Sequence, residues 1–215
     1  MGWTLHLLNA RGRLSAVEAE TRAALAEAEA RLGAVAPAVA LDVVIRAMDH
    51  PMPPALRVTG ASYGPGRMEL GIDLLQGGPE GLRHEVLKAV YHEYHHVLRW
   101  DGPGYGDTLG AALVSEGLAQ VFVHEMMDCA PEPWEVMPSG VDLRALCLRA
   151  HAEFDATGYD HEAWFFGGDD LPDGTGYALG RMLVERLLAE RSGQTALGIA
   201  VEPAAGFREA LLRLA

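Results

Sequence analysis

Lysine, cysteine and long apolar runs are all scarce in this chain of 215 residues. Lys88 is the only lysine, and the only cysteines, Cys129 and Cys147, are too few for a disulfide framework and do not form a C-x-x-C pair. We therefore expect two buried thiols. No stretch approaches the roughly 20 apolar residues of a membrane span, and Met1 to His6 lacks the basic start and apolar stretch of a signal peptide. These absences predict a soluble cytoplasmic protein.

Acidic residues outnumber basic ones, 30 against 17, which gives a net charge of -13. Such a charge repels phosphate backbones and anionic lipid surfaces, so the composition predicts no nucleic-acid partner and no membrane partner. Apolar residues make up 49% and charged residues 22%, which is typical of globular proteins. At this length we expect one domain, residues 1–215, with a sheet lobe at 1–100 and a helical lobe at 101–215. These features leave the oligomeric state open.

The apolar residues follow a strand period early in the chain and a helix period later. Residues 39–48 are rich in β-branched residues, and residues 67–74 alternate apolar with polar side chains, so both segments predict strands. Helices are expected at residues 15–32, 79–100, 108–127, 141–154, 175–191 and 203–214. A sheet followed by helices predicts an α+β fold. We expect residues 67–74 to be an edge strand along which an extended peptide binds.

The segment from Tyr91 to His96 reads Y-H-E-Y-H-H and contains the motif H-E-x-x-H. In a helix, His92 and His96 lie one turn apart and Glu93 lies about 100° from His92, so the three side chains share one flank. Two imidazoles at this spacing can bind one metal ion, with the glutamate beside them as general base. Because so short a motif also occurs by chance, it gains weight mainly from the helix that follows it.

Glu116 lies 20 positions beyond His96, at the centre of an apolar face of the next expected helix. Burying an unpaired carboxylate costs on the order of several kcal/mol, so this side chain should be either protonated or paired with a cation. A zinc ion held by His92 and His96 would be that cation. Gly117, beside it, leaves room for another helix to approach closely. The sequence thus predicts Zn2+ bound by His92, His96 and Glu116.

These motifs resemble those of the gluzincin metallopeptidases, in which a glutamate on the helix after H-E-x-x-H is the third zinc ligand. More narrowly, the chain is similar to a bacterial family of predicted zinc-dependent proteases that shares H-E-Y-H-H, S-E-G-L-A, W-x-F-G and G-Y-x-L-G, here at 92–96, 115–119, 164–167 and 176–180. The resemblance spans roughly Leu82 to Leu188. It implies a gluzincin-like zincin domain that hydrolyses peptide bonds.

The chain departs from this pattern at one position. Thermolysin-like gluzincins carry an aspartate four residues after the ligand glutamate, which orients a zinc histidine, whereas this chain has Gln120 there. A glutamine can still accept a hydrogen bond from an imidazole N–H, but it adds no charge. The group that supports the zinc histidines is therefore open.

The expected chemistry is peptide-bond hydrolysis by a metal-activated water, with Glu93 as the general base that then returns the proton to the leaving amine. The substrate would be a peptide or a protein. The developing oxyanion needs a donor besides the metal, and Tyr177 at the start of a helix is the candidate, with His124 and His161 behind it. Because Tyr177 adjoins an apolar stripe, a packed core tyrosine is an equal alternative.

Other interpretations use the same residues. His92, Glu93 and His96 could form the solvated flank of an amphipathic helix, which Glu116 in a matching context disfavours. Glu93-x-x-His96 is also the E-x-x-H of ferritin-like di-iron redox proteins, but no second E-x-x-H exists and the expected strands do not fit a four-helix bundle. A catalytically inactive zincin-fold binding protein is a further alternative, which the intact motif disfavours. We interpret His95 as a surface residue or a support for the site.

Overall fold

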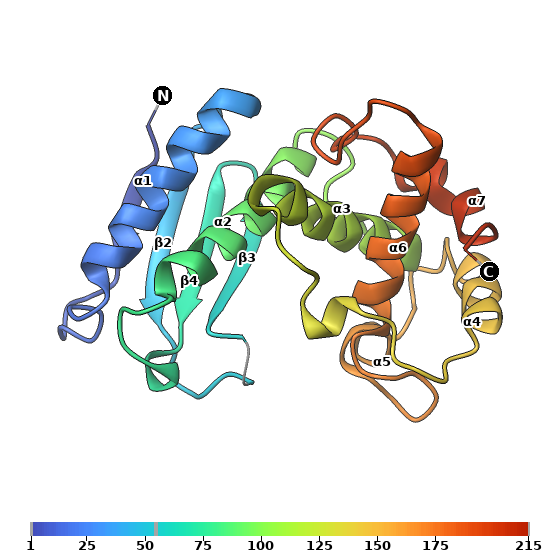
Figure 1. The fold of residues 1–215 in the computed structure, drawn as a ribbon, viewed down its shortest axis with the longest axis horizontal. Helices are drawn as coiled ribbons and strands as arrows, with labels where there is room; N and C mark the ends of the chain where they lie inside the picture. The colour runs from blue at the N-terminus through green and yellow to red at the C-terminus, as the bar shows by residue number, and fades with distance from the viewer. Residues whose placement is uncertain (1, 54–55, 215) are drawn as a thin grey trace. The chain divides into compact units, whose positions relative to one another are not determined.

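The computed structural model describes residues 2–53 and 56–214. The chain divides into two compact units, Met1–Val97 and Leu98–Ala215. A small four-stranded sheet lies in the first unit, and the remainder of the chain is mostly helical, so the predicted α+β class is confirmed (Figure 1). No helix in the described part of the chain is long and apolar enough to cross a membrane.

The sheet of the first unit mixes parallel and antiparallel pairs. Its strands are β1 (Thr4–Leu7), β2 (Asp42–Ala47), β3 (Val58–Gly64) and β4 (Arg67–Ile72), in the order β1-β2-β4-β3. Strands β1, β2 and β4 are parallel, and β3 runs antiparallel to β4. Parallel neighbours need a crossover, which α1 (Glu18–Val35) supplies between β1 and β2. The expectation that residues 67–74 form an edge strand is wrong, because β4 pairs with β2 on one side and β3 on the other.

Two of these strands are absent from the sequence prediction. β1 has only four residues, and β3 reads V-T-G-A-S-Y-G, without the regular apolar alternation of a half-buried strand. Glycines are also depleted in strands, because they lose more conformational entropy and pack no side chain. The contacts of Gly60, described below, explain why a glycine is nevertheless suited to this position.

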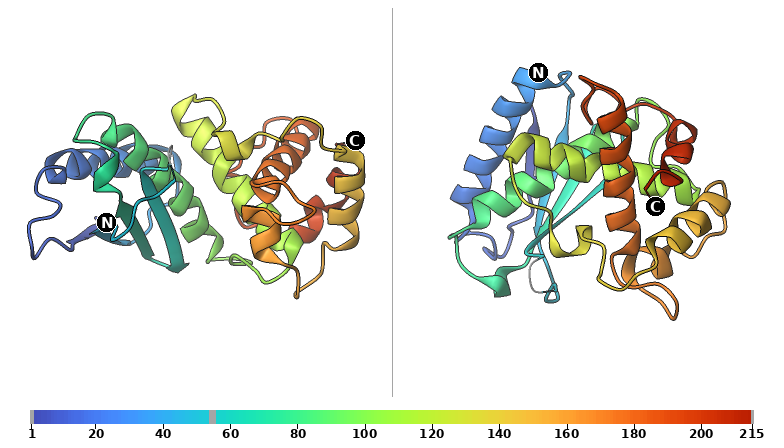
Figure 2. Two further views of the ribbon diagram at one scale, coloured as in Figure 1. Left: turned by 90° about the horizontal axis from the view of Figure 1, so that it is seen from below. Right: turned by 45° about the vertical axis from the view of Figure 1, so that its right-hand side comes forward.

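Helices α1 and α2 (Leu82–Arg99) lie on the same face of the sheet (Figures 1 and 2). They are joined by the Arg83 guanidinium, whose Nε donates to Glu27 Oε2 over 2.6 Å. The Tyr94 hydroxyl of α2 donates to the carbonyl of Pro37 over 2.6 Å, just beyond the end of α1. Apolar side chains from both helices and from the strands fill this core, among them Ala24, Ala28, Leu32, Val43, Ile45, Met68, Leu70, Val86 and Val90. The helix that carries H-E-x-x-H is therefore fixed on the sheet.

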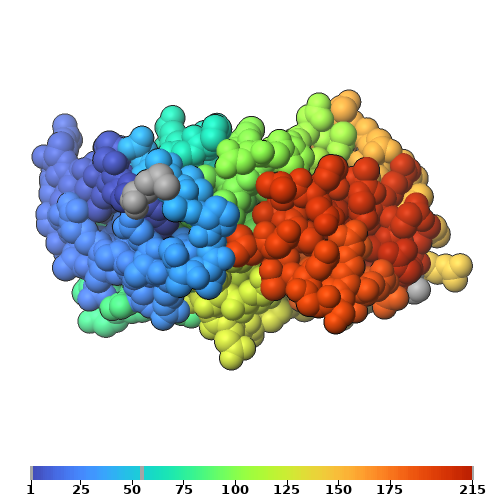
Figure 3. Space-filling model, turned by 90° about the horizontal axis from the view of Figure 1, so that it is seen from above, coloured from blue at the N-terminus to red at the C-terminus, as the bar shows by residue number. Residues whose placement is uncertain are grey.

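The second unit is built around α3 (Leu109–Met127), which is buried over most of its length. The other helices of this unit are α4 (Leu143–Ala152), α5 (His161–Phe166), α6 (Thr175–Glu190) and α7 (Arg208–Leu211). It also contains 3-10 turns at Pro133–Glu135 and Ala204–Phe207, and the first unit contains a 3-10 turn at Leu74–Gln76. Figure 3 shows α6 and the segment after it, coloured orange to red, covering much of the visible surface of this unit. The helix expected over 203–214 is mostly wrong, since only a 3-10 turn and the short α7 form there.

Helices α3 and α6 cross at two glycines. A Cβ atom on Gly117 would lie 2.1 Å from the carbonyl oxygen of Gly180, and a Cβ atom on Gly180 would lie 2.4 Å from the carbonyl oxygen of Leu113. Both distances are far below van der Waals contact, so only hydrogen fits at each position. Gly117 thus allows a close helix approach, and the helix that approaches it is α6. This crossing fixes the part of α3 that carries Glu116.

Candidate metal centre

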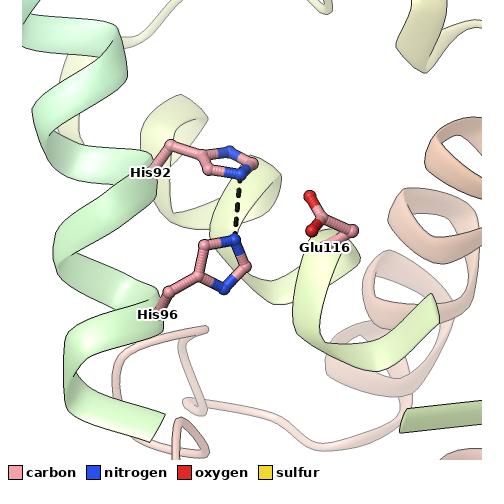
Figure 4. Close-up of side chains that lie close together, drawn as sticks. All are labelled: His92, His96 and Glu116. Carbon is pink, nitrogen blue, oxygen red and sulfur yellow. Dashed lines mark hydrogen bonds between the residues drawn. The ribbon is translucent and has the colours of Figure 1, made fainter. Parts of the chain in front are cut away.

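His92 and His96 lie one turn apart on α2, and their Nε2 atoms are 3.1 Å apart (Figure 4). The ring centroids are 4.8 Å apart, and the ring planes meet at 78°. Two nitrogens bound to one tetrahedral zinc at the usual Zn–N length would be about 3.3 Å apart. The histidine pair therefore already has the nitrogen spacing of two ligands to one ion.

The carboxylate of Glu116 on α3 completes a three-residue group with this pair. One ligand atom from each of His92, His96 and Glu116 lies within 4.8 Å of the other two (Figure 4). Two ligands of one tetrahedral zinc lie about 3.3 Å apart, so a ligand atom at the 4.8 Å limit would have to move closer by about 1.5 Å when the ion binds. The structure thus brings together the three predicted ligands, and two imidazoles with one carboxylate are a donor set that suits zinc.

Glu93 lies on α2 beside His92 and is only 5% exposed. Its side chain passes directly over Gly60 of β3, where a Cβ atom would lie 2.4 Å from Glu93 Cγ and 2.6 Å from Oε1. The hydroxyl of Ser62, two residues along β3, donates to the Glu93 carbonyl over 2.9 Å. Strand β3 therefore packs against Glu93, and because Gly60 has no side chain there is space for the Glu93 carboxylate.

Two tyrosines of the second unit, Tyr105 and Tyr159, interact with Glu116. The hydroxyl of Tyr105, in the turn before α3, donates to Glu116 Oε1 over 2.8 Å. Burial and the neighbouring charge of Glu116 raise the pKa of Tyr105 above its ordinary value. The same two causes raise the pKa of Tyr159, whose hydroxyl lies 2.9 Å from His161 Nδ1. Both phenols therefore remain protonated at neutral pH.

Tyr177 lies in the first turn of α6 and is half-buried. Its ring meets Phe165 edge-on at 5.0 Å and Phe166 at 6.3 Å between centroids. The ring is therefore packed against other aromatic rings, as the core alternative expects. A catalytic role for Tyr177 stays a prediction.

The two histidines expected behind Tyr177 have different surroundings. His161 stacks on Phe165 with centroids 4.6 Å apart, which places it in the same aromatic group as Tyr177. His124 lies about two helical turns beyond Glu116 on α3, and its Nε2 is 2.9 Å from Glu135 Oε2. The structure thus keeps His161 near Tyr177 and pairs His124 with a carboxylate.

His95 and Gln120, which the sequence suggests as possible supports of the metal site, are both buried. His95 is 0% exposed, so its interpretation as a surface residue is wrong. Gln120 is 1% exposed, and neither of its amide atoms has a hydrogen-bond partner among the described residues. Support of a zinc histidine by Gln120 therefore stays a prediction.

Sequence reasoning does not identify Tyr105 and Tyr159 as the tyrosines that interact with Glu116. Tyr105 follows Gly104 and precedes Gly106 in a short turn, and Tyr159 lies in the segment before α5. Neither residue has a fixed helical spacing to Glu116, because the chain between them is irregular. The glycines around Tyr105 are the one signal of a tight turn that could have drawn attention to it.

The fold and the site together define a class: an α+β protein with a candidate single-ion centre of two imidazoles and one carboxylate. A protein-family model described as "Predicted Zn-dependent protease (DUF2268)" matches residues 25–207, which is well over half of the chain. The chain therefore belongs to this family. Searches of curated proteins and of solved structures give no significant match.

Proposed function

We propose that this protein is a zinc-dependent peptidase in which His92, His96 and Glu116 hold the metal and Glu93 is the general base. The observation that carries the proposal is the convergence of three ligand atoms within 4.8 Å of one another. The family description names zinc and proteolysis independently of this geometry. Three protein ligands leave a coordination position open, as catalytic zinc sites require.

Zinc at this site would lower the pKa of a coordinated water toward about 7 and polarise the scissile carbonyl. Glu93 would accept a proton at its carboxylate and deliver it to the leaving amine. Its low exposure and the contact with Gly60 limit the orientations that its carboxylate can adopt. Tyr177, at the start of α6, would donate its hydroxyl proton in a hydrogen bond to the developing oxyanion.

Strand β3 is the favoured place for an extended peptide substrate. Among the described strands β3 pairs with β4 and forms one edge of the sheet, the position at which a peptide adds as a further strand. Gly60 on this strand lies under Glu93, which would place a peptide along the edge near the general base. Main-chain pairing tolerates varied side chains and suits either short peptides or unfolded protein segments.

The test compares Glu93→Gln with the wild type on a library of internally quenched peptides. The substitution keeps the size of the side chain but removes the base, so hydrolysis should fall by about 100-fold to 10,000-fold. Zinc content should stay at the wild-type level, because Glu93 is not one of the three grouped ligands. Full activity of Glu93→Gln on a peptide that the wild type cleaves would show that the mechanism is wrong.

The test also separates the alternatives. A wild type that binds zinc but cleaves no peptide in the library would favour the inactive binding protein. A ferritin-like di-iron protein is disfavoured by the fold itself, because α2 packs on a four-stranded sheet and not in a four-helix bundle.

A further inference from the structure

Glu116 is held by a residue from outside its own helix. Tyr105 lies in the turn Gly104–Gly106 that leads into α3, and its hydroxyl is 2.8 Å from Glu116 Oε1. Both flanking glycines have positive φ angles, 69° and 82°, which residues with side chains rarely adopt. The turn is therefore shaped so that the phenol points back at the carboxylate eleven residues later.

The turn is closely packed at both ends. A Cβ atom on Gly104 would contact the ring of Trp100 at 3.3 Å, and one on Gly106 would lie 2.4 Å from the Cβ of Ala111. The Thr108 side chain then caps α3 by accepting a hydrogen bond from the Ala111 N–H over 3.1 Å. This packing leaves little space around the turn, and a tyrosine side chain, with only two rotatable bonds, costs little entropy to order as a donor.

We propose that Tyr105 is a positioning residue, which binds Oε1 of Glu116 and thereby presents Oε2 to the metal. This inference rests on the proposed metal centre. A glutamate side chain has several rotatable bonds, and ordering it costs conformational entropy when a ligand binds. A hydrogen bond made before the ion arrives removes part of that cost. It also occupies one carboxylate oxygen, so the carboxylate is favoured to bind the ion through the other.

Residues that orient metal ligands typically change metal affinity by about 10-fold to 100-fold when they are replaced. Tyr105→Phe removes only the hydroxyl and leaves the ring, so it is the direct test. Zinc affinity is measured by competition with a chromophoric chelator, and thermal unfolding of the zinc-free protein is measured in parallel. We expect weaker zinc binding by about 10-fold or more, with little change in the unfolding temperature of the zinc-free protein.

Tyr159→Phe is the matched control. Its phenol also feels the charge of Glu116, but its hydroxyl is engaged with His161. Loss of this hydroxyl should leave zinc affinity unchanged. An equal loss of affinity in both variants would show a general effect of the aromatic group and would overturn the specific role of Tyr105.

A double-mutant cycle with Glu116→Ala separates positioning from structural support. If Tyr105 acts through Glu116, Tyr105→Phe has no effect on the residual zinc affinity once the carboxylate is gone. If the two effects add, Tyr105 acts elsewhere and the inference is wrong. Glu116→Leu, which also removes the acceptor oxygen, replaces Glu116→Ala in the cycle if the alanine variant does not fold.

The cycle also distinguishes this inference from the proposed function. A wild type that binds zinc as tightly as Tyr105→Phe would overturn the role of Tyr105 and leave the metal centre intact. A wild type that binds no zinc would overturn the proposed function and this inference with it.

Discussion

Gly60→Ala tests whether strand β3 sets the position of the general base. The added methyl group would lie 2.4 Å from Cγ and 2.6 Å from Oε1 of Glu93. The φ angle of Gly60 is not positive, so the backbone itself accepts alanine. The substitution therefore acts through a single contact, the one between the new methyl group and the Glu93 side chain.

The expected loss follows from the distance that must open. Non-bonded carbon atoms approach to roughly 3.5 Å, so Glu93 or the strand must move by about 1 Å. A displacement of that size in a reacting group can cost about 100-fold in rate. We expect kcat/KM for a quenched fluorescent peptide to fall by about that factor, while zinc affinity stays at the wild-type value because the three atoms nearest to the added methyl group all belong to Glu93, which is not a ligand.

Ala61→Ser is the control for this experiment, because successive residues of a strand point to opposite faces, and Ala61 pairs with Glu69 whereas Gly60 pairs with the buried Leu70. It should leave activity unchanged. In a Glu93→Gln background, Gly60→Ala should have no further effect, since the group that it displaces is already inactive. Wild-type activity in Gly60→Ala, with zinc bound, would refute the argument that the contact between β3 and Glu93 matters for catalysis.

Two further predictions concern the second unit. Gly117→Ala forces α3 away from α6 and should lower the free energy of unfolding, measured by urea denaturation, by about 1 to 3 kcal/mol. Gly33→Ala in α1 is the control and should not destabilise, because nothing lies within 4 Å of its added methyl group. A Gly117→Ala variant as stable as the wild type would contradict the close crossing. Tyr177→Phe should lower turnover by more than about tenfold, as loss of an oxyanion donor does, with zinc content and unfolding temperature retained. Unchanged turnover would assign Tyr177 to packing alone.

The helices could be predicted from sequence because their signals are local. The apolar period predicts helices at 79–100 and 108–127. The structure has α2 at Leu82–Arg99 and α3 at Leu109–Met127, close to these bounds. Sheet order has no local signal, because pairing joins segments that are far apart in the chain. Strand β3 was therefore missed and β4 was misplaced at the edge. The glycine that weakens the strand pattern at position 60 is the residue that makes space for Glu93.

The candidate site likewise could be predicted only where its signals are local in the sequence. Helical spacing alone sets His92 and His96 on one flank, and the apolar face around Glu116 predicts a buried carboxylate. That the three ligand atoms meet within 4.8 Å depends on tertiary packing, which no spacing encodes. Tyr105 reaches Glu116 through the backbone of an irregular turn, so it could be found only from the structure.

Metal analysis of the purified protein tests the central claim most directly. Two imidazoles and one carboxylate form one three-ligand site, so the wild type should carry about one zinc per chain. Glu116→Ala, which removes one ligand, should carry much less at the same free zinc concentration. A wild type without zinc, one with two irons per chain, or a Glu116→Ala variant that binds zinc as tightly as the wild type would contradict the account.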